Sequence, residues 1–239
     1  MKIKSNIVFA ILALVLLGSC STETIRVSGE VTSVTYNFSD YDVLNVSDDF
    51  NVFVRFSPTE EEIRVEANAD LQEKIIVRKE GNVLTIKFDR NLNVRGNATQ
   101  NVYITTASIT QFKGFGDVEI DLENILIAEN IKIELFGDSN FEGEIATKNL
   151  TLSLRGDSDM NIFGNADDVV ANLQGDSTFR DYDLSTLDLD IDLSGDSDAY
   201  LSVSESIKIR ASGDSRLYYK GNPEIVRQRL TGDSKLIKR

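Results

Sequence analysis

The sequence contains no histidine and no tryptophan, one cysteine and two prolines. Without histidine there can be no Ser-His-Asp or Cys-His arrangement, no imidazole metal site and no histidine-based pH switch. One cysteine cannot form an internal disulfide. These absences exclude most hydrolase and zinc chemistries from the candidate functions.

The single cysteine, Cys20, follows a segment that is typical of a bacterial export signal. Lys2 and Lys4 precede the apolar run IVFAILALVLLG, whose 12 residues are too few to span a bilayer as a helix. The run ends in LLGSC, which resembles the lipobox of bacterial lipoproteins, with Leu17 three residues before the cysteine. This resemblance implies cleavage before Cys20 and lipid attachment to it. The alternative is an ordinary secreted protein with a free thiol.

Acidic residues outnumber basic ones, at 39 against 25, a net charge of −14. Removing residues 1–19 takes away two lysines and no acid, which leaves −16. Such a surface repels nucleic acid and anionic lipid headgroups. We therefore expect no nucleic-acid partner, and membrane attachment through the lipid alone. The last 13 residues, RQRLTGDSKLIKR, are locally basic and form either a solvated end or an end that binds a partner.

The dipeptide Gly-Asp recurs seven times, at steps of 21, 19, 19, 20, 18 and 19 residues. Six of the seven copies continue with serine, and the first continues with valine. Self-similarity at such a period predicts a solenoid. The glycines are Gly116, Gly137, Gly156, Gly175, Gly195, Gly213 and Gly232, and the aspartates are Asp117, Asp138, Asp157, Asp176, Asp196, Asp214 and Asp233.

The residues around each glycine alternate between apolar and polar, as in LTLSL before Gly156 and LDLDIDL before Gly195. A period of 2 indicates a strand with one buried face. The residue four places after each glycine is also mostly apolar, so each repeat is expected to hold two short strands around a Gly-Asp-Ser corner. Such a coil buries its apolar face by stacking on the next, at about 4.8 Å per coil. The sequence therefore predicts an all-β fold, a parallel β-solenoid (β-helix) with coils of about 19 residues.

The corner residues have distinct expected roles. Glycine suits a sharp corner with unusual φ and ψ angles. The Asp and Ser side chains are expected to bond nearby N–H groups of the turn. Strand parity places serine inward and aspartate outward, and Val118 in the serine position of the first corner agrees with this.

The N-terminal third alternates less regularly. FNVFVRF and VLTIKF are predicted strands, KEGN around Gly81 is a predicted hairpin turn, and Pro58 belongs to an exposed turn. No linker separates this part from the repeats. We therefore predict a signal peptide over 1–19, a lipidated tether over 20–34 and one solenoid domain over 35–239, less regular over 35–110.

The segment YDVLNVSDDFNVFVRFSPTEEEIRVEANADLQEKIIVRKEGNVLTIKF, with FKGFGDVEI and the repeats after it, resembles the putative auto-transporter adhesin, head GIN domain family. The resemblance covers roughly residues 35–239. It implies a β-helical envelope protein of Bacteroidetes-like bacteria, and it supplies no catalytic residue.

Stacked coils place the seven aspartates about 5 Å apart, where neighbours repel by about 0.9 kcal/mol per pair in water. Bonding to corner N–H groups, solvent and salt can offset this repulsion. The alternative is a ladder of Ca²⁺ ions, which prefer oxygen ligands. We assign no metal site and no cofactor. Four tyrosines could stack on sugars, or could be half-buried by packing: Tyr182, Tyr200, Tyr218 and Tyr219.

The sequence thus favours a lipid-anchored β-solenoid of the outer membrane, facing either the cell surface or the periplasm. Its expected role is binding or adhesion to a glycan or a protein. A structural or assembly protein of the periplasm with no external ligand is the alternative. A glycan-active enzyme is less favoured, because no long insertion interrupts the coils to build a cleft.

Overall fold

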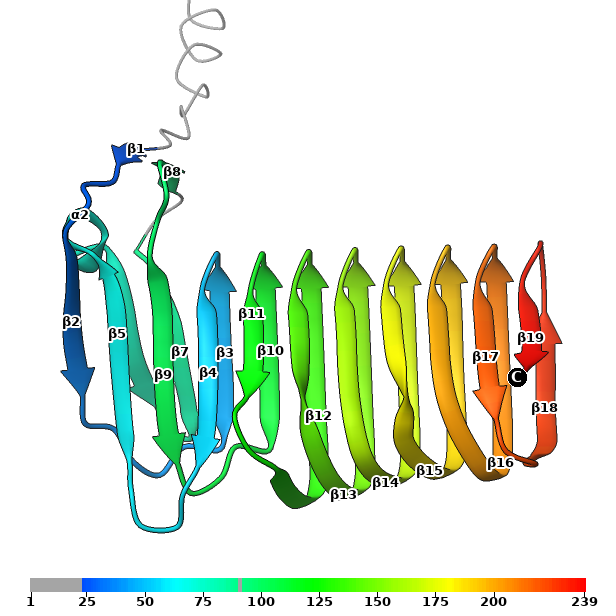
Figure 1. The fold of residues 1–239 in the computed structure, drawn as a ribbon. Coiled ribbons are helices and arrows are strands. Elements are labelled where there is room, and N and C mark those ends of the chain that lie inside the picture. Colours follow the sequence, from blue (N-terminus) through cyan, green and yellow to red (C-terminus); the bar gives the residue numbers. More distant parts are fainter. Residues whose placement is uncertain (1–22, 90–91) are drawn as a thin grey trace, which may run out of the picture.

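The chain folds into a stack of flattened coils, shown side-on in Figure 1. The computed structural model describes residues 23–89 and 92–239. Successive coils pair in parallel and in register, for example Leu152 with Ala171 and Ala171 with Ile191. The predicted parallel β-solenoid with coils of about 19 residues is confirmed. Within the described part of the chain, no helix is long and apolar enough to cross a membrane.

The strands of the N-terminal part are β1 (Glu23–Arg26), β2 (Val31–Tyr36), β3 (Val43–Asp48), β4 (Asn51–Phe56), β5 (Glu62–Asn68), β6 (Ile75–Glu80), β7 (Val83–Phe88), β8 (Leu92–Arg95) and β9 (Gln100–Thr106), with the short helix α2 (Ala69–Gln72). The coils comprise β10 (Gln111–Gly116), β11 (Glu119–Leu122), β12 (Leu126–Gly137), β13 (Asn140–Gly156), β14 (Asp159–Gly175), β15 (Thr178–Gly195), β16 (Asp198–Gly213), β17 (Arg216–Lys220), β18 (Glu224–Leu230) and β19 (Lys235–Lys238).

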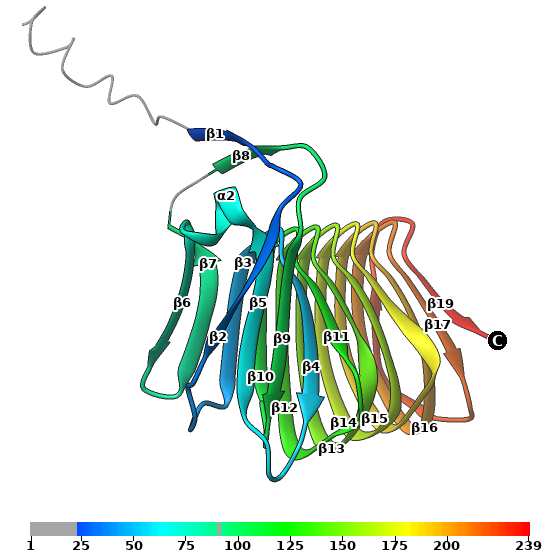
Figure 2. The same cartoon turned by 60° about the vertical axis from the view of Figure 1, so that its left-hand side comes forward.

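Each coil contributes one strand segment to each of two facing sheets. We call sheet A the face formed by the segments that run into the glycine corners, such as 150–156 and 169–175, and sheet B the face formed by the segments that leave them, such as 140–147 and 159–166. The long strands β13 to β16 turn from sheet B into sheet A at the edge opposite the glycine corners (Figures 1 and 2).

The space between the sheets is filled by the inward side chains that the alternation predicts. Leu135, Leu154 and Leu173 in sheet A and Phe141 and Phe179 in sheet B are fully buried. Burial of this surface is the main stabilising term of the fold, at about 25 cal/mol per Å² of apolar area.

The glycine corners are held by backbone contacts between coils. Gly175 has φ +95°, and a Cβ built on it would lie 2.5 Å from the carbonyl oxygen of Gly156 in the preceding coil. That oxygen accepts a hydrogen bond from the N–H of Asp176 at 2.9 Å. The corner thus needs glycine both for its left-handed backbone and for the close approach of the next coil.

The corner serines point inward, as parity predicts, and all are buried. The hydroxyl of Ser177 lies 3.1 Å from the carbonyl oxygens of Gly156 and of Gln174, so its one proton is shared between two acceptors. Val118 takes the same buried position in the first corner.

The structure contains one further corner that the glycine pattern does not reveal. Gly116 pairs with Asp48, and β4 leaves this corner as β11 leaves the next one. Asp48 has φ +76°, and its carboxylate accepts a hydrogen bond from the N–H of Phe88 at 2.8 Å. An aspartate fits here because its side chain bonds the end of β7.

The N-terminal part continues both sheets and closes their end. In sheet B, β2 pairs antiparallel with β5, and β5 antiparallel with β9. In sheet A, β6 and β7 form the predicted hairpin, with Gly81 at its turn. Leu71 of α2 is buried beside these strands, while β1 and β8 form a separate two-stranded sheet (Figure 2). β1 and part of β2 thus lie within the segment 20–34, for which we expected a tether.

The last coil departs from the predicted alternation. Val226 and Gln228 were expected to face inward, but both are exposed, Val226 by 53%. A register shift lets Ile225 pair with Ile207 and Arg227 pair with Lys208. The bulge allows Ile225 to pack against the core, and Gln228 is exposed because no further coil covers it.

Candidate functional site

The corner aspartates form an exposed row along one edge of the solenoid. In residues 23–89 and 92–239, none of their side chains accepts a hydrogen bond from a backbone N–H, so the expected bonding to turn N–H groups is wrong. The serine hydroxyls bond the corner instead, and Asp214 pairs with Arg216 at 2.6 Å. No group of three or more potential metal ligands occurs in the same part of the chain.

Cys20, the predicted lipid attachment site, lies outside the described residues. The seven corner glycines and aspartates are brought together by stacking, in the order in which they occur in the sequence. They form a structural edge, and the structure shows no depression built by them among the pockets described below.

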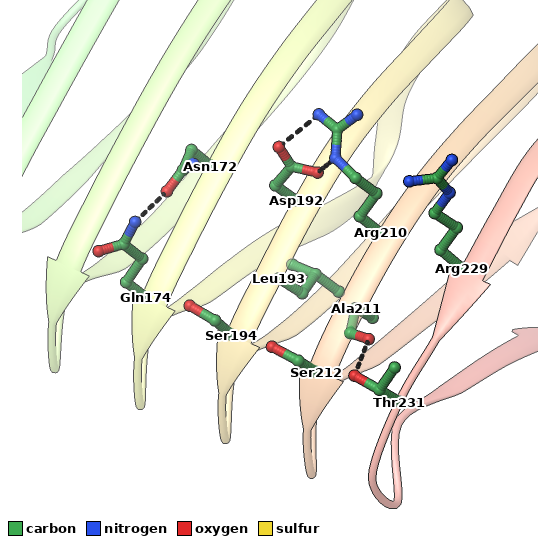
Figure 3. A pocket seen from close by; sticks show the side chains of 10 residues that line it. All are labelled: Asn172, Gln174, Asp192, Leu193, Ser194, Arg210, Ala211, Ser212, Arg229 and Thr231. Carbon is green, nitrogen blue, oxygen red and sulfur yellow. Dashed lines mark hydrogen bonds and ion pairs between the residues drawn. The ribbon is translucent and has the colours of Figure 1, made fainter.

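The strongest candidate for a binding site is a shallow depression of about 330 Å³ on the outer face of sheet A (Figure 3). We call it the sheet A depression. It is lined by Asn172, Gln174, Asp192, Leu193, Ser194, Arg210, Ala211, Ser212, Arg229 and Thr231.

The depression arises from a change of side-chain size along one column of the sheet. The residue before each corner glycine points outward, and this column begins with Phe115 and Phe136, whose rings stack at 4.8 Å. Farther along, the same column holds Gln174, Ser194 and Ser212. Two small residues beside larger neighbours leave a hollow in an otherwise flat surface.

The walls of the depression are held in place by side-chain contacts (Figure 3). Arg210 donates two hydrogen bonds to the carboxylate of Asp192, at 2.5 and 2.6 Å. The hydrogen bond with Asp192, with the charge of the same carboxylate, raises the pKa of Arg210. Asn172 accepts a hydrogen bond from the side-chain amide of Gln174 at 2.9 Å.

A family model now places these features in context. The model of the family described as putative auto-transporter adhesin, head GIN domain matches residues 40–223. The chain belongs to this family. No curated protein matches the chain significantly.

Three solved structures share the fold of this GIN-domain chain. A putative adhesin from Bacteroides fragilis is 19% identical, with a TM-score of 0.80 over 90% of this chain and 97% of that one. A putative adhesin from Parabacteroides merdae is 15% identical, with a TM-score of 0.71 over 91% and 100%. A putative lipid binding protein from Parabacteroides distasonis is 15% identical, with a TM-score of 0.75 over 91% and 100%.

These descriptions name adhesins and a binding protein rather than enzymes. They indicate an adhesin-like protein of the cell envelope or surface. At such low identities the structural likeness establishes the fold alone.

A second depression of the GIN domain, of about 500 Å³, lies on sheet B beside the tyrosines. Tyr200 and Tyr218 stack on each other at 4.6 Å, and the guanidinium of Arg239 lies 4.9 Å from the Tyr218 ring. The ammonium of Lys220 lies 4.1 Å from the ring of Tyr182. Burial raises the pKa of Tyr200, with the charge of Asp198 adding to it.

The tyrosines are thus half-buried by packing, which is the second of the two interpretations that the sequence left open. Their ring faces are occupied by one another and by cations, and sugars stack on free ring faces. The sheet A depression, which the sequence did not single out, is therefore the better candidate. The change from bulky to small residues before successive glycines was the signal that could have found it.

Proposed function

We propose that this GIN-domain protein is a non-catalytic binding module of the cell envelope that holds a glycan in the sheet A depression. The observation that supports this proposal most directly is the composition of the depression. Its side chains are amides, hydroxyls, a carboxylate and guanidinium groups, all from neighbouring strands of one sheet.

Such side chains match the hydrogen-bonding groups of a sugar. A carboxylate or amide can bond two adjacent hydroxyls of one ring, and a serine hydroxyl can both donate and accept. Asn172, Asp192 and Arg210 are constrained by their mutual contacts and by the strands that carry them. Sites on strands hold their geometry better than sites on loops, which lowers the entropic cost of binding a flexible glycan.

The surface is less suited to a stable protein interface. Such interfaces have a buried core rich in apolar and aromatic residues. Exposed large apolar residues of the described chain, such as Phe115 and Val170, lie on different strands, β10 and β14, which do not pair. Single exposed apolar residues are normal on any protein surface.

The absence of catalysis is part of the proposal. Glycoside hydrolysis by the usual route needs two carboxyl groups, one of which acts as an acid. Asp192 is the single carboxylate among the lining residues, and Arg210 holds it with two hydrogen bonds. This arrangement favours binding without bond cleavage.

A glycan array with the purified domain tests the proposal. Asn172→Ala and Gln174→Ala should each weaken binding to any glycan that the protein retains, while Asn161→Ala on sheet B should not. Equal loss in all three variants, or no binding to any glycan, would contradict the proposal. The second result would favour a structural or assembly protein without an external ligand.

We further propose that lipid on Cys20 anchors the protein in the outer membrane, with the domain at the cell surface or in the periplasm. Protease shaving of intact cells, with lysed cells as the control, separates the two locations. Loss of the domain from intact cells would support adhesion. Protection until lysis would contradict adhesion and favour a periplasmic partner.

A further inference from the structure

We infer that the ligand of the sheet A depression is an acidic glycan, bound through its anionic groups by a cluster of four cations. The cluster consists of Lys208, Arg210, Arg227 and Arg229, and we call it the cationic cluster. This inference rests on the proposed function and adds to it the chemical class of the ligand.

The register of the last two strands of sheet A places the four cations in a square. Lys208 pairs with Arg227, and Arg210 pairs with Arg229. Paired residues lie about 4.8 Å apart across the sheet, and residues two apart on one strand lie about 6.5–7 Å apart. The buried neighbours Ile207, Ile209 and Ala211 face the core, so the cations between them point outward.

The bulge at Val226 makes this arrangement possible. Without it, continued pairing after Ile225 and Ile207 would place Val226, and not Arg227, beside Lys208. The register shift keeps Ile225 against the core and still brings both arginines to the outer face. β-Bulges often re-aim side chains at functional sites.

Three of the four cations lack a partner within the chain. Arg210 is paired with Asp192, but Lys208, Arg227 and Arg229 form no ion pair or side-chain hydrogen bond with any residue in 23–89 and 92–239. Asp190 is the other nearby carboxylate, since it pairs in register with Lys208. The cluster therefore carries more positive than negative charge.

This excess stands out because the rest of the chain is acidic. Arginine forks bind carboxylate, sulfate and phosphate groups with two parallel hydrogen bonds, which suits them to anionic substituents of a polymer. Arg210 and Arg229 also line the sheet A depression, beside Ser194, Ser212 and Asn172. An anionic group on the cluster would thus place the rest of its sugar over the hydroxyl and amide side chains (Figure 3).

Three oligosaccharides of equal length, titrated into the purified domain by calorimetry, test the inference. The probes are an oligogalacturonate, which carries carboxylates, a chondroitin sulfate oligosaccharide, which carries carboxylates and sulfates, and a neutral maltooligosaccharide. We expect an acidic probe to bind at least about tenfold more tightly than the neutral one, and its affinity to fall as salt rises. The two acidic probes distinguish carboxylate from sulfate recognition.

The double variant Arg227→Gln and Arg229→Gln should weaken binding of the acidic probe about tenfold or more. The matched control is Lys235→Gln with Lys238→Gln, which removes the same charge from the same end of the solenoid but from sheet B. The control should change the affinity less than about twofold. Circular dichroism confirms that both variants fold.

Equal loss in the two double variants would overturn the inference, because it would mean unspecific attraction to a basic end. Tighter binding of the neutral probe, lost in Asn172→Ala but not in the arginine variant, would overturn the acidic ligand and leave the proposed glycan-binding function standing. Binding of none of the probes, together with an empty glycan array, would overturn both.

Discussion

At the scale of single residues, the solenoid depends on positions where a side chain cannot be added. Corner glycines combine a left-handed backbone with a carbonyl oxygen of the preceding coil at the place of a Cβ. Asp48 shows what changes when no corner precedes it, since it is left-handed as well but carries a side chain. Contact with the preceding corner, and not φ alone, therefore requires glycine.

Gly175→Ala should lower the free energy of unfolding by about 2–4 kcal/mol, because left-handed strain adds to a displaced backbone. Urea unfolding measures this change. Gly81→Ala, at φ +60° with open space around the Cβ, should lose only the strain, about 1–2 kcal/mol. Gly29→Ala, with neither feature, is the control. Equal losses at Gly175 and Gly81 would show that the contact has no effect.

The corner serines make a smaller contribution. Ser177→Ala leaves the carbonyl oxygen of Gln174 without its hydroxyl donor and should cost about 1–2 kcal/mol of unfolding free energy. Ser185→Ala, at an exposed position of the neighbouring strand β15, should cost less than about 0.5 kcal/mol. A neutral effect at Ser177 would mean that packing alone fills the serine column, as Val118 does in the first corner.

At the scale of strands, like charges face each other across sheet B. Asp121 on β11 lies near Glu119 and pairs in register with Glu142 of β13. Burial, and then the charges of Glu119 and Glu142, raise the pKa of Asp121 above its ordinary value of 3.8. The charged carboxylate therefore destabilises the folded state at neutral pH.

Asp121→Asn should raise the free energy of unfolding at pH 7. The folded protein binds the Asp121 proton more tightly than the unfolded chain does, so the gain should disappear as the pH falls below 3.8, where both states of the wild type are protonated. Chemical denaturation at pH 7 and pH 3 measures both values. Glu144→Gln controls for removing one negative charge, and a gain that persists at pH 3 would contradict the assignment.

The strands and corners of the repeats could be predicted because one period controls both. Alternation fixed which side chains face inward, and stacking needed nothing more. The corner at Asp48 could not be found by a glycine pattern, and its evidence is the pairing of β3 with β7 and β10. Nor could parity reveal the bulge at Val226, because a bulge adds one residue and changes the pairing without changing the composition. The depression was missed for a different reason: it depends on side-chain size on the outer face, whereas the alternation reports only the inner face.

At the scale of the whole molecule, the two ends of the solenoid differ. The N-terminal end is closed by antiparallel strands and α2, whereas the C-terminal end finishes in β18 and β19, each paired on one side only (Figure 1). Repeat proteins derive their stability from contacts between neighbouring coils, so an end coil has half the support of an inner one. Cationic side chains on these edge strands also discourage strand addition by further copies.

Amide hydrogen exchange should follow this asymmetry. We expect the strongest protection in β13, β14 and β15, which have coils on both sides, and the weakest in β18 and β19. Mass spectrometry of exchanged peptides gives the profile. Uniform protection across 126–239 would mean that the coils unfold as one unit and would contradict the expected gradient.

The identical spacing of the coils has a consequence for how such proteins can evolve. Because each inner coil offers the next one the same corner, duplicating one unit of about 19 residues requires no new contact chemistry, and deleting one breaks none. Each such event would lengthen or shorten the rod by about 4.8 Å. Variation in repeat number could therefore set how far the C-terminal binding face stands from the N-terminal end, independently of the residues that recognise the ligand.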